Sequence, residues 1–479
     1  MSTTVQSARP GQAAPEAAPD RVAITVGLAV LGVFVTYVPI TGVSVALDTI
    51  SRDTGATTSQ LQWVSDGYII PMAAAVLSAG VFGDKYGRRR LFSLGMALTV
   101  LGAVVAGLAE LLGDHAIAGL WTGQAISGVG AGLLLPTTLA LIAAAVPNPH
   151  ARGRYIGFWA TGIVVGLAVG PLISGTILTV ASWGWIFLPS VILATAAGLI
   201  AHAKLPESRH PEGRHLDWPG QITATIAIGA SIYGVIEGGA QGWGSAEALV
   251  GLGVGAVALV LFIVVELRSD APVMDLTLFH SPAFSAAGLS ALVALFSVVG
   301  TMFLLSLFLG SVQHLSALQI GVRLLFVSGV AAVASPLVGM LMARVRPMSL
   351  LIAGLLLNAV AGLLLLGVGS DTSFGAFAWR LSVFGISLSL MLTSVTAVAI
   401  NAVSWTAAGM ASAGNTALRQ TGGALGPAIL GAIYASGLQQ GMSAAGALHH
   451  ALLTNVVLLL VAMIACLVAA ASRRQHHQA

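Results

Sequence analysis

Apolar runs of about twenty residues recur along almost the whole chain, and short segments between them contain most of the charged residues. A helix that crosses about 30 Å of hydrocarbon needs about 20 apolar residues, because each residue rises about 1.5 Å. Within hydrocarbon, backbone amides find partners only inside the protein, so runs of this length are expected to be helices. The pattern therefore predicts an all-α integral membrane protein.

Composition supports this prediction, because only 8% of the 479 residues are charged and 57% are hydrophobic. A soluble domain has about 25% charged residues, since its surface faces water. This chain has too few polar side chains to cover itself, and its 58 glycines suit helices that pack closely in a bilayer. The basic residues form short clusters between the runs, which indicates membrane topology rather than a nucleic-acid surface.

We predict about fourteen membrane spans, arranged as six, two and six. They centre near Val35, Ala74, Leu101, Gly130, Val165, Leu193, Ala227, Val257, Ala294, Ala331, Leu356, Ser389, Gly422 and Leu459. Polar stretches at 204–218 and 266–275 flank the middle pair. The predicted organisation is a disordered tail (1–20), a six-helix bundle (21–203), a linker with two extra helices (204–275), a second six-helix bundle (276–472) and a tail (473–479).

The distribution of basic residues orients the predicted helices. With the N-terminus in the cytoplasm, all but four of the 20 Lys and Arg fall in inner segments. The exceptions are Arg52, Arg323, Arg380 and Arg419. Cytoplasmic loops are rich in Lys and Arg, and an even number of spans puts both termini on one side. We therefore expect a multi-pass protein of the cell membrane with both termini in the cytoplasm.

The strongest local motif is Gly80–Arg90, at the inner end of the second run. Gly83 and Gly87 permit a tight turn and a close approach of backbones. Asp84 and Arg88 are four residues apart, so a helical or turn conformation brings them together. An acid here can also accept hydrogen bonds from the N-terminus of a neighbouring helix, and such a latch would close one state of the protein. The alternative is an ordinary basic loop.

This segment resembles the loop signature of the major facilitator superfamily, and further motifs agree with it. They are Gly128–Pro136, Gly166–Gly175, Ser182–Leu188, Pro272–Phe279 and Asn415–Gly426. Together they resemble the fourteen-helix drug:proton antiporter branch, and the resemblance extends from Val35 to Ala435. It implies two six-helix bundles that expose a central site alternately to the two sides of the membrane. It also implies export of drugs or antibiotics in exchange for protons.

Small residues recur at every fourth position of the fifth run, at Gly162, Gly166, Gly170 and Ser174. They line one face of a helix, where another helix can pack against the backbone. Pro171 frees a backbone carbonyl and permits a bend. By the resemblance, this helix lies between the two halves and favours export, whereas the spacing alone is equally consistent with simple packing.

Two positions depart from the pattern of the family. Family members usually have an Arg at the position of Gln124, and many members of the branch have an acid at the position of Pro39. The loss of both charges makes the first half of the cavity less polar, because intramembrane charges are its most polar groups. This change suits a neutral or lipophilic substrate, and resistance restricted to permanent dications would contradict it.

Three charged residues inside the runs are, together with Gln124, candidates for the proton or substrate pathway. Removal of water favours the protonated form of a carboxylate, so Asp66, near the outer end of the second run, is the first candidate for proton binding. An interfacial carboxylate with a structural role is the alternative. Arg323 and Arg419 are expected to face the protein interior, either as substrate ligands or as structural partners.

Other classes of function fit the sequence less well. No nucleotide-binding sequence of the form Gly-x-x-x-x-Gly-Lys-Ser/Thr is present, so ATP is not expected to drive this chain directly. The single Cys466 lies in the last run, which argues against a disulfide and a thiolate metal site. We expect no metal, no cofactor and no enzymatic activity. The expected partners are a small lipophilic substrate, protons and the bilayer, with the oligomeric state left open.

Two other functions are also consistent with parts of this sequence evidence. A transporter of the same fold dedicated to one natural product or metabolite, exporting or importing it, is the first. A membrane enzyme or sensor is the second, and it would need clustered His or Asp within the spans, whereas most of the 11 histidines fall in loops and tails.

Overall fold

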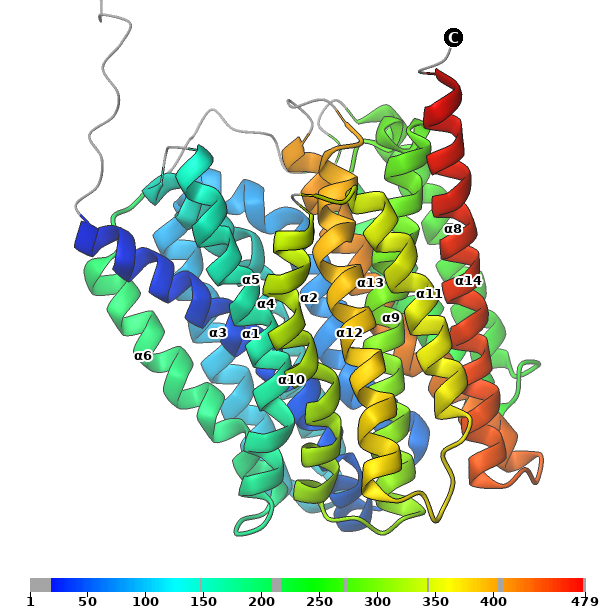
Figure 1. The fold of residues 1–479 in the computed structure, drawn as a ribbon. Coiled ribbons are helices and arrows are strands. Elements are labelled where there is room, and N and C mark those ends of the chain that lie inside the picture. The colour runs from blue at the N-terminus through cyan, green and yellow to red at the C-terminus, as the bar shows by residue number, and fades with distance from the viewer. Residues whose placement is uncertain are drawn as a thin grey trace, which may run out of the picture.

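The computed structural model describes residues 19–146, 149–208, 217–269, 272, 274–342, 344–403 and 408–476. Within these ranges the chain forms fourteen α-helices and three short 3₁₀ helices, with no strand among them. The start of α1 and the end of α14 lie at the same end of the bundle, at the top of Figure 1. We call this the terminal end, and the other the opposite end.

The first half contains six helices that run alternately between the two ends. They are α1 (Pro19–Thr54), α2 (Thr58–Tyr86), α3 (Arg88–Leu108), α4 (Ala116–Ala145), α5 (Pro149–Ile177) and α6 (Leu188–Lys204), with η1 (Ala109–His115) and η2 (Trp183–Phe187) between them. Thr57 and Gln60 form a capping box that begins α2. Gly113, at φ 55 and ψ −119, turns the chain back between α3 and α4.

The second half repeats this arrangement. It contains η3 (Leu276–His280), α9 (Pro282–Ser311), α10 (Ala317–Leu341), α11 (Pro347–Leu365), α12 (Phe374–Ile400), α13 (Ala408–Gln439) and α14 (Ala444–His476). Ser281, Ser316 and Ser373 begin α9, α10 and α12, because each side chain accepts a hydrogen bond from the N–H three residues later. Pro282, in the first turn of α9, needs no hydrogen bond for its nitrogen.

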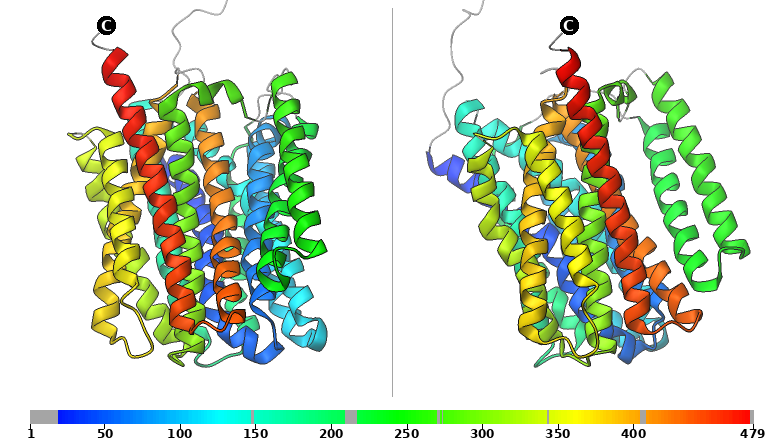
Figure 2. Two further views of the ribbon diagram at one scale, coloured as in Figure 1. Left: turned by 90° about the vertical axis from the view of Figure 1, so that its right-hand side faces the viewer. Right: turned by 45° about the vertical axis from the view of Figure 1, so that its right-hand side comes forward.

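An additional helix pair lies on one flank of the bundle (Figure 2). It consists of α7 (Trp218–Gln241) and α8 (Ala246–Arg268), and α7 packs against both α2 and α13. A Cβ atom on Gly239 would lie 2.4 Å from the Ala432 Cβ, so the backbones of α7 and α13 approach closely. Val250, Val257 and Leu267 of α8 are more than half exposed, as expected of a helix that faces lipid.

The predicted all-α, multi-pass fold is confirmed, whereas the number of spans stays a prediction. By length and hydropathy, 11 stretches of the described residues can cross a membrane, or 12 if the bent pair Thr58–Val76 and Ser78–Tyr86 counts as one span. One of these stretches, Arg88–Ala145, contains both α3 and α4, and α13 is not among them. The division of the chain at 203/204 and 275/276 also stays a prediction.

The predicted tails overlap the described residues only at their edges. Residues 1–18 of the first tail lie outside the described residues, and α1 already begins at Pro19. Helix α14 continues through His476, so the first four residues of the second predicted tail are helical. The apolar pattern ends before the helix does, because a helix can extend beyond hydrocarbon into the polar region of the membrane.

Gly239→Leu is expected to weaken the docking of α7 on α13. The new side chain would overlap Ala432, and overpacking of this kind costs about 1–3 kcal/mol. Thermal unfolding of the purified protein in detergent, followed by tryptophan fluorescence, should show a lower midpoint than that of the wild type. Gly244→Leu is the matched control, because a Cβ there meets nothing within 4 Å. Equal midpoints for the two variants would contradict close docking.

Candidate functional site

The turn between α2 and α3, at the terminal end, contains Gly83, Asp84, Gly87 and Arg88. Gly87 has φ 106 and ψ 133, a conformation that residues with a side chain rarely adopt, and its N–H donates to the Gly83 carbonyl at 3.0 Å. Arg88 Nη2 lies 2.9 Å from Asp84 Oδ1, and Arg88 Nη1 donates to the Ala140 carbonyl at 3.2 Å. Arg88 therefore joins the ends of α2, α3 and α4.

The segment after α6 holds this turn in place. The Arg89 N–H donates to Glu207 Oε1 at 3.1 Å, and the Arg88 N–H donates to the Ser208 carbonyl at 3.0 Å. Glu207 Oε2 also lies 3.6 Å from Arg89 Nε and 3.7 Å from Arg90 Nε. These partners belong to the first half or to the segment directly after α6, so the structure places the turn in a local network, and the latch that would close one state of the protein stays a prediction.

The glycine stripe of α5 packs against α1, within the first half. Cβ atoms on Gly162, Gly166 and Gly170 would lie 2.9, 3.0 and 2.5 Å from the carbonyl oxygens of Val30, Phe34 and Val38, respectively. Ser174 continues the stripe, since its Oγ would lie 2.7 Å from a Cβ on Gly42. Thr41 Oγ1 donates to the Leu167 carbonyl at 3.0 Å and ties the same two helices together.

A neighbouring face of α5 touches the second half. A Cβ on Gly321 of α10 would lie 2.5 Å from the Pro171 carbonyl oxygen, and a Cβ on Gly175 would lie 2.8 Å from the Leu318 Cα. One helix therefore combines close packing inside its own half with close packing across to the other half.

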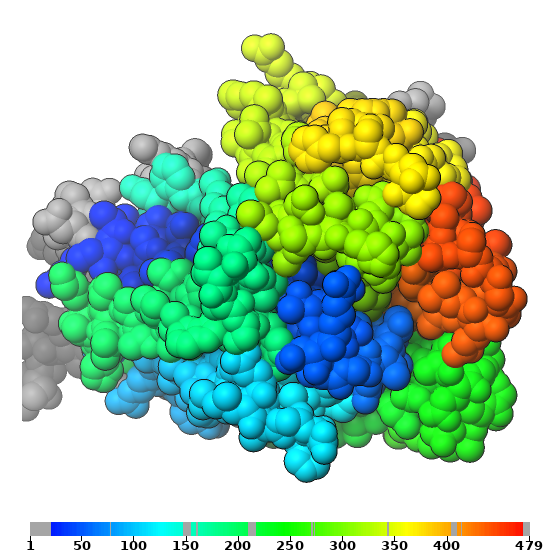
Figure 3. Space-filling view, turned by 90° about the horizontal axis from the view of Figure 1, so that it is seen from below, coloured from blue at the N-terminus to red at the C-terminus, as the bar shows by residue number. Residues whose placement is uncertain are grey.

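Side-chain hydrogen bonds also cross between the halves toward the opposite end. They run from Arg52 Nη2 to Gly310 O (3.2 Å), from Ser306 Oγ to Ser44 O, and from Gln62 Nε2 to Pro427 O (3.1 Å) and Ala428 O (3.2 Å). Seen from this end, the atoms around the turn between α1 and α2 fill the centre of the surface between the two halves (Figure 3). The structure is thus closed at the opposite end.

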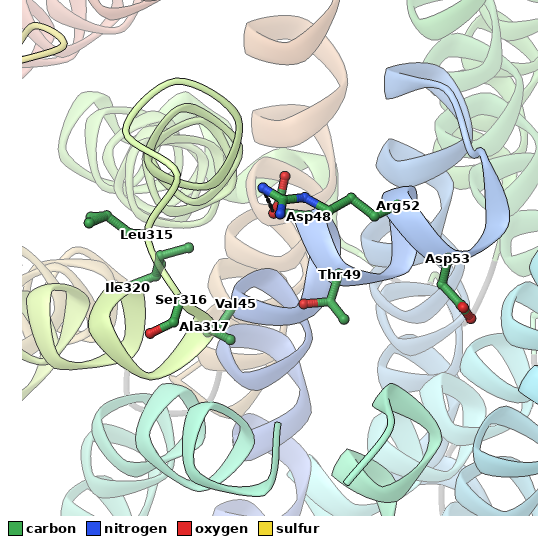
Figure 4. A pocket seen from close by; sticks show the side chains of 9 residues that line it. All are labelled: Val45, Asp48, Thr49, Arg52, Asp53, Leu315, Ser316, Ala317 and Ile320. Carbon is green, nitrogen blue, oxygen red and sulfur yellow. Dashed lines mark ion pairs between the residues drawn. The ribbon is translucent and has the colours of Figure 1, made fainter. Parts of the chain in front are cut away.

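A pocket of about 410 Å³ lies beside this closure, where the end of α1 meets the start of α10 (Figure 4). Asp48 and Arg52 form an ion pair of 2.9 Å on its wall, and Asp53 Oδ2 accepts a hydrogen bond from Trp183 Nε1 at 2.8 Å. Because Arg52 also reaches the Gly310 carbonyl, the polar wall of the pocket is part of the contact between the halves.

Arg419 and Tyr37 meet near the middle of the bundle, from different halves. Tyr37 is a buried residue close to the midpoint of α1, and Arg419 lies near the midpoint of α13. The Arg419 guanidinium is near enough to the Tyr37 hydroxyl to interact with it electrostatically. Arg419 Nε is buried and has no hydrogen-bond partner among the described residues. This pair joins the two halves at mid-depth.

Tyr68 and Gln420 extend the polar cluster around this pair. Tyr68 Oη donates to the Thr36 carbonyl at 2.7 Å, one residue before Tyr37. Gln420 Nε2 approaches Met72 Sδ at 3.2 Å, while Gln420 Oε1 is buried without a partner in the described part of the chain. Unused hydrogen-bonding groups are thus held at the centre, where a polar part of a ligand could bind.

Asp66 is fully buried, and neither carboxylate oxygen has a hydrogen-bond partner among the residues that the structure describes. Residues three and four positions away share its side of α2. Gln62 and Ile69 contact Pro427 and Gly423 of α13, respectively. Trp63 and Ile70 contact Tyr233 and Gly229 of α7, respectively. Asp66 therefore lies at the junction of α2, α7 and α13.

Gln124 and Arg323 lie apart from the central pair. Gln124 Nε2 donates to the Val64 carbonyl at 3.0 Å, so it joins α4 to α2 two residues before Asp66. The Arg323 guanidinium lies 5.3 Å from the centre of the Phe374 ring and donates to the Gln319 carbonyl at 3.2 Å, near the start of α10. Of the predicted pathway residues, only Arg419 reaches across to the first half at mid-depth.

Tyr37, Tyr68 and Gln420 are the central residues that the sequence analysis missed. A signal for the first two was available, because a tyrosine hydroxyl inside an apolar run needs a polar partner. The described residues contain no group of three or more His, Cys, Asp or Glu that could hold a metal ion. The chemistry of the centre is therefore that of hydroxyl, amide and guanidinium groups, which bind polar ligands.

Comparisons with known proteins agree with this architecture. The family model described as Major Facilitator Superfamily matches residues 29–427. The chain is 35% identical over 410 residues to the multidrug resistance protein Stp of Mycobacterium tuberculosis (strain CDC 1551 / Oshkosh), covering 85% of this chain and 75% of that protein. It is 30% identical over 405 residues to the methylenomycin A resistance protein of Bacillus subtilis (strain 168), covering 84% and 85%.

Solved structures share the fold at low sequence identity. A crystal structure of a D-xylose-proton symporter superposes with a TM-score of 0.67 at 13% identity, over 94% of this chain and 96% of that chain. Identity this low carries information on the fold alone.

Gln62→Leu is expected to favour forms that are open at the opposite end, because it removes both hydrogen bonds to α13. Each such bond contributes about 0.5–1.5 kcal/mol, so the open population should rise at least about fivefold. Spin labels on Ser59→Cys and Asp371→Cys, in a Cys466→Ser background, report the separation of the halves by pulsed electron paramagnetic resonance. Gln124→Leu breaks a similar bond within one half and should leave the distances unchanged. If both variants changed the distance between the labels equally, the Gln62 hydrogen bonds would not be what closes the opposite end.

Proposed function

The chain belongs to the major facilitator superfamily, and on this premise we propose that it exports lipophilic drugs or antibiotics across the cell membrane by alternating access. Membership makes it a multi-pass membrane transporter of small molecules and not an enzyme. The observation that carries the proposal is its 35% identity to a protein named for multidrug resistance. The glycine stripe of α5, which resembles the motif of exporters, supports the outward direction.

The proposed orientation places the terminal end in the cytoplasm. The basic turn with Arg88, Arg89 and Arg90 lies at that end, and basic residues favour the cytoplasmic side. The hydrogen bonds from Arg52, Ser306 and Gln62 would then close the outer side of the transporter. They would break when the halves rotate to release the substrate, while the central pair stays near the pivot.

Proton influx is the proposed driving reaction, and Asp66 is the proposed proton site. Burial of an ionised carboxylate without a partner is costly, whereas a protonated carboxyl group is neutral. Asp66 sits where helices of both halves meet α7, so a change in its charge acts on contacts that differ between the two states. One charge moved across 100 mV yields about 2.3 kcal/mol, enough for a gradient of roughly fifty-fold.

A transporter dedicated to one compound is the second candidate. It is favoured by the 30% identity to a Bacillus subtilis protein that is named for resistance to a single antibiotic. The two candidates differ in substrate range and not in mechanism.

Asp66→Asn is expected to abolish coupling of transport to a pH gradient. The measurement uses proteoliposomes in which the transporter is inverted, so that an exporter carries drug into the lumen. A pH gradient is imposed across the membrane, and a pH-sensitive dye in the lumen reports proton movement. The pH gradient should accelerate transport by the wild-type protein about tenfold or more. Transport by the variant should be equally fast with and without the gradient. Glu237→Gln is the matched control, since Glu237 is an acid in α7 that already accepts a hydrogen bond from Gln241 at 2.6 Å. Normal coupling in Asp66→Asn would remove this residue from the proton path.

A growth assay separates the two candidates. An efflux-deficient bacterial host that expresses the chain should tolerate several unrelated lipophilic antibiotics at fourfold or higher concentrations if the transporter is broad. Methylenomycin A, a neutral lipophilic dye and a lipophilic organic anion form a suitable panel. Protection against one compound only would favour the dedicated transporter. Protection against none, with the protein present in the membrane, would contradict both.

A further inference from the structure

The positive charge of Arg419 has no negative counterpart in the described residues. Their ion pairs join Asp48 to Arg52, Asp84 to Arg88, and Glu207 to Arg89 and Arg90. All of these pairs lie near helix ends, and none includes Arg419. The polar group that interacts with it electrostatically is the neutral hydroxyl of Tyr37, and its Nε has no hydrogen-bond partner in the described ranges.

The packing of α13 directs Arg419 toward the contact between the halves. Asn415 donates to the Ala287 carbonyl at 3.5 Å, and a Cβ on Gly422 would meet the Leu292 carbonyl, so this side of α13 faces α9. The adjacent Gln420 faces Met72 of α2. Arg419 projects between these two directions, toward Tyr37 of α1, and its guanidinium therefore lies among helices of both halves.

Asp66 does not balance this charge. Ile69 lies level with Gly423, since a Cβ on Gly423 would be 3.7 Å from Ile69 Cγ2. Helices α2 and α13 are antiparallel. Asp66 precedes Ile69 by about one turn of α2 and therefore lies nearer the opposite end. Arg419 precedes Gly423 by about one turn of α13 and therefore lies nearer the terminal end. At about 1.5 Å per residue, the two are separated by about 10 Å along the bundle. Pro39, at the position where the family resemblance would place an acid, contributes no charge.

An unpaired guanidinium at this depth is costly unless an anion accompanies it. Its planar donors match the paired oxygens of a carboxylate or sulfonate, and it is less strongly hydrated than an ammonium group. Tyr37 belongs to a cluster of buried apolar side chains that includes Met72, Leu295 and Val299, and such a cluster suits an apolar body attached to the charged group. The centre thus combines one positive charge that has no ion-pair partner in the described residues with buried apolar side chains.

We propose that the transported compound is a lipophilic organic anion and that Arg419 binds its charged group beside Tyr37. This inference rests on the proposed function, because it names the substrate class of the same transporter. The anion completes the charge balance at the centre, and a permanent cation is disfavoured there by repulsion. Arg419 is thereby the residue that determines the sign of charge the site accepts.

Two fluorescent probes of nearly equal shape test the proposal. Dansyl sulfonate is an anion at neutral pH and dansyl amide is neutral, and the fluorescence of both rises in an apolar site. Titration into the purified protein in detergent, with empty micelles as background, gives the two dissociation constants. Wild-type protein should bind the sulfonate at least tenfold more tightly than the amide. Equal affinities, a preference for the amide or no saturable binding of the sulfonate would overturn the proposal without any variant.

Variants then assign the preference to one residue. Arg419→Gln should lower the ratio of affinities about tenfold, mainly by weakening sulfonate binding, and Arg419→Lys should retain part of the preference. Arg380→Gln is the matched control, because it removes a positive charge from α12 near the opposite end, where Arg380 lies 4.9 Å from the Trp379 ring centre. An unchanged ratio in Arg419→Gln, or an equal loss in Arg380→Gln, would contradict the assignment.

The binding assay is independent of export. If proteoliposomes export no compound while the preference for the sulfonate holds, the proposed function fails and the anion site stands. If efflux is normal while the two probes bind equally, the substrate class fails and the proposed function stands.

Discussion

Close approach of backbones at glycine holds each half of this protein together. Between helices in a bilayer there is no gain from removing apolar surface from water, so contact at small residues and hydrogen bonding must hold them. In the first half, a Cβ on Gly170 would lie 2.5 Å from the Val38 carbonyl oxygen, and in the second half a Cβ on Gly426 would lie 2.5 Å from the Phe296 carbonyl oxygen. Helices α5 and α13 thus serve the same role in the two halves.

The same two helices also border the other half, and this arrangement suits relative motion of two rigid units. Helix α5 contacts α10, and α13 contacts α2. Inside each half the packing is backbone against backbone, which permits little adjustment. Between the halves, part of the contact is made by single side-chain hydrogen bonds such as that of Gln62, which can break and re-form in water. The hydrogen-bonded part of the boundary between the halves can therefore open more readily than the packing inside each half.

Much of the fold follows from the sequence, because hydrocarbon leaves a chain few alternatives to apolar helices. The turn at Gly87 and the packing face of α5 were also predictable, since glycine spacing and a φ of 106 have direct local causes. The surroundings of Asp66 were not, because they depend on where the extra helix α7 docks. Tyr37 became significant only through Arg419, which is 382 positions later in the sequence. Pairings between distant helices leave no periodic signal in a single sequence.

The flanking helix α7 has a consequence for how the molecule can move. It touches α2 of one half and α13 of the other, so it bridges the two halves along one flank, and the described residues include no such helix over the contact of α5 with α10. When two bodies are joined along one flank, they can move apart most widely on the opposite flank. The spacing of α5 and α10 therefore has the larger freedom to change, while Asp66 lies beside the bridge.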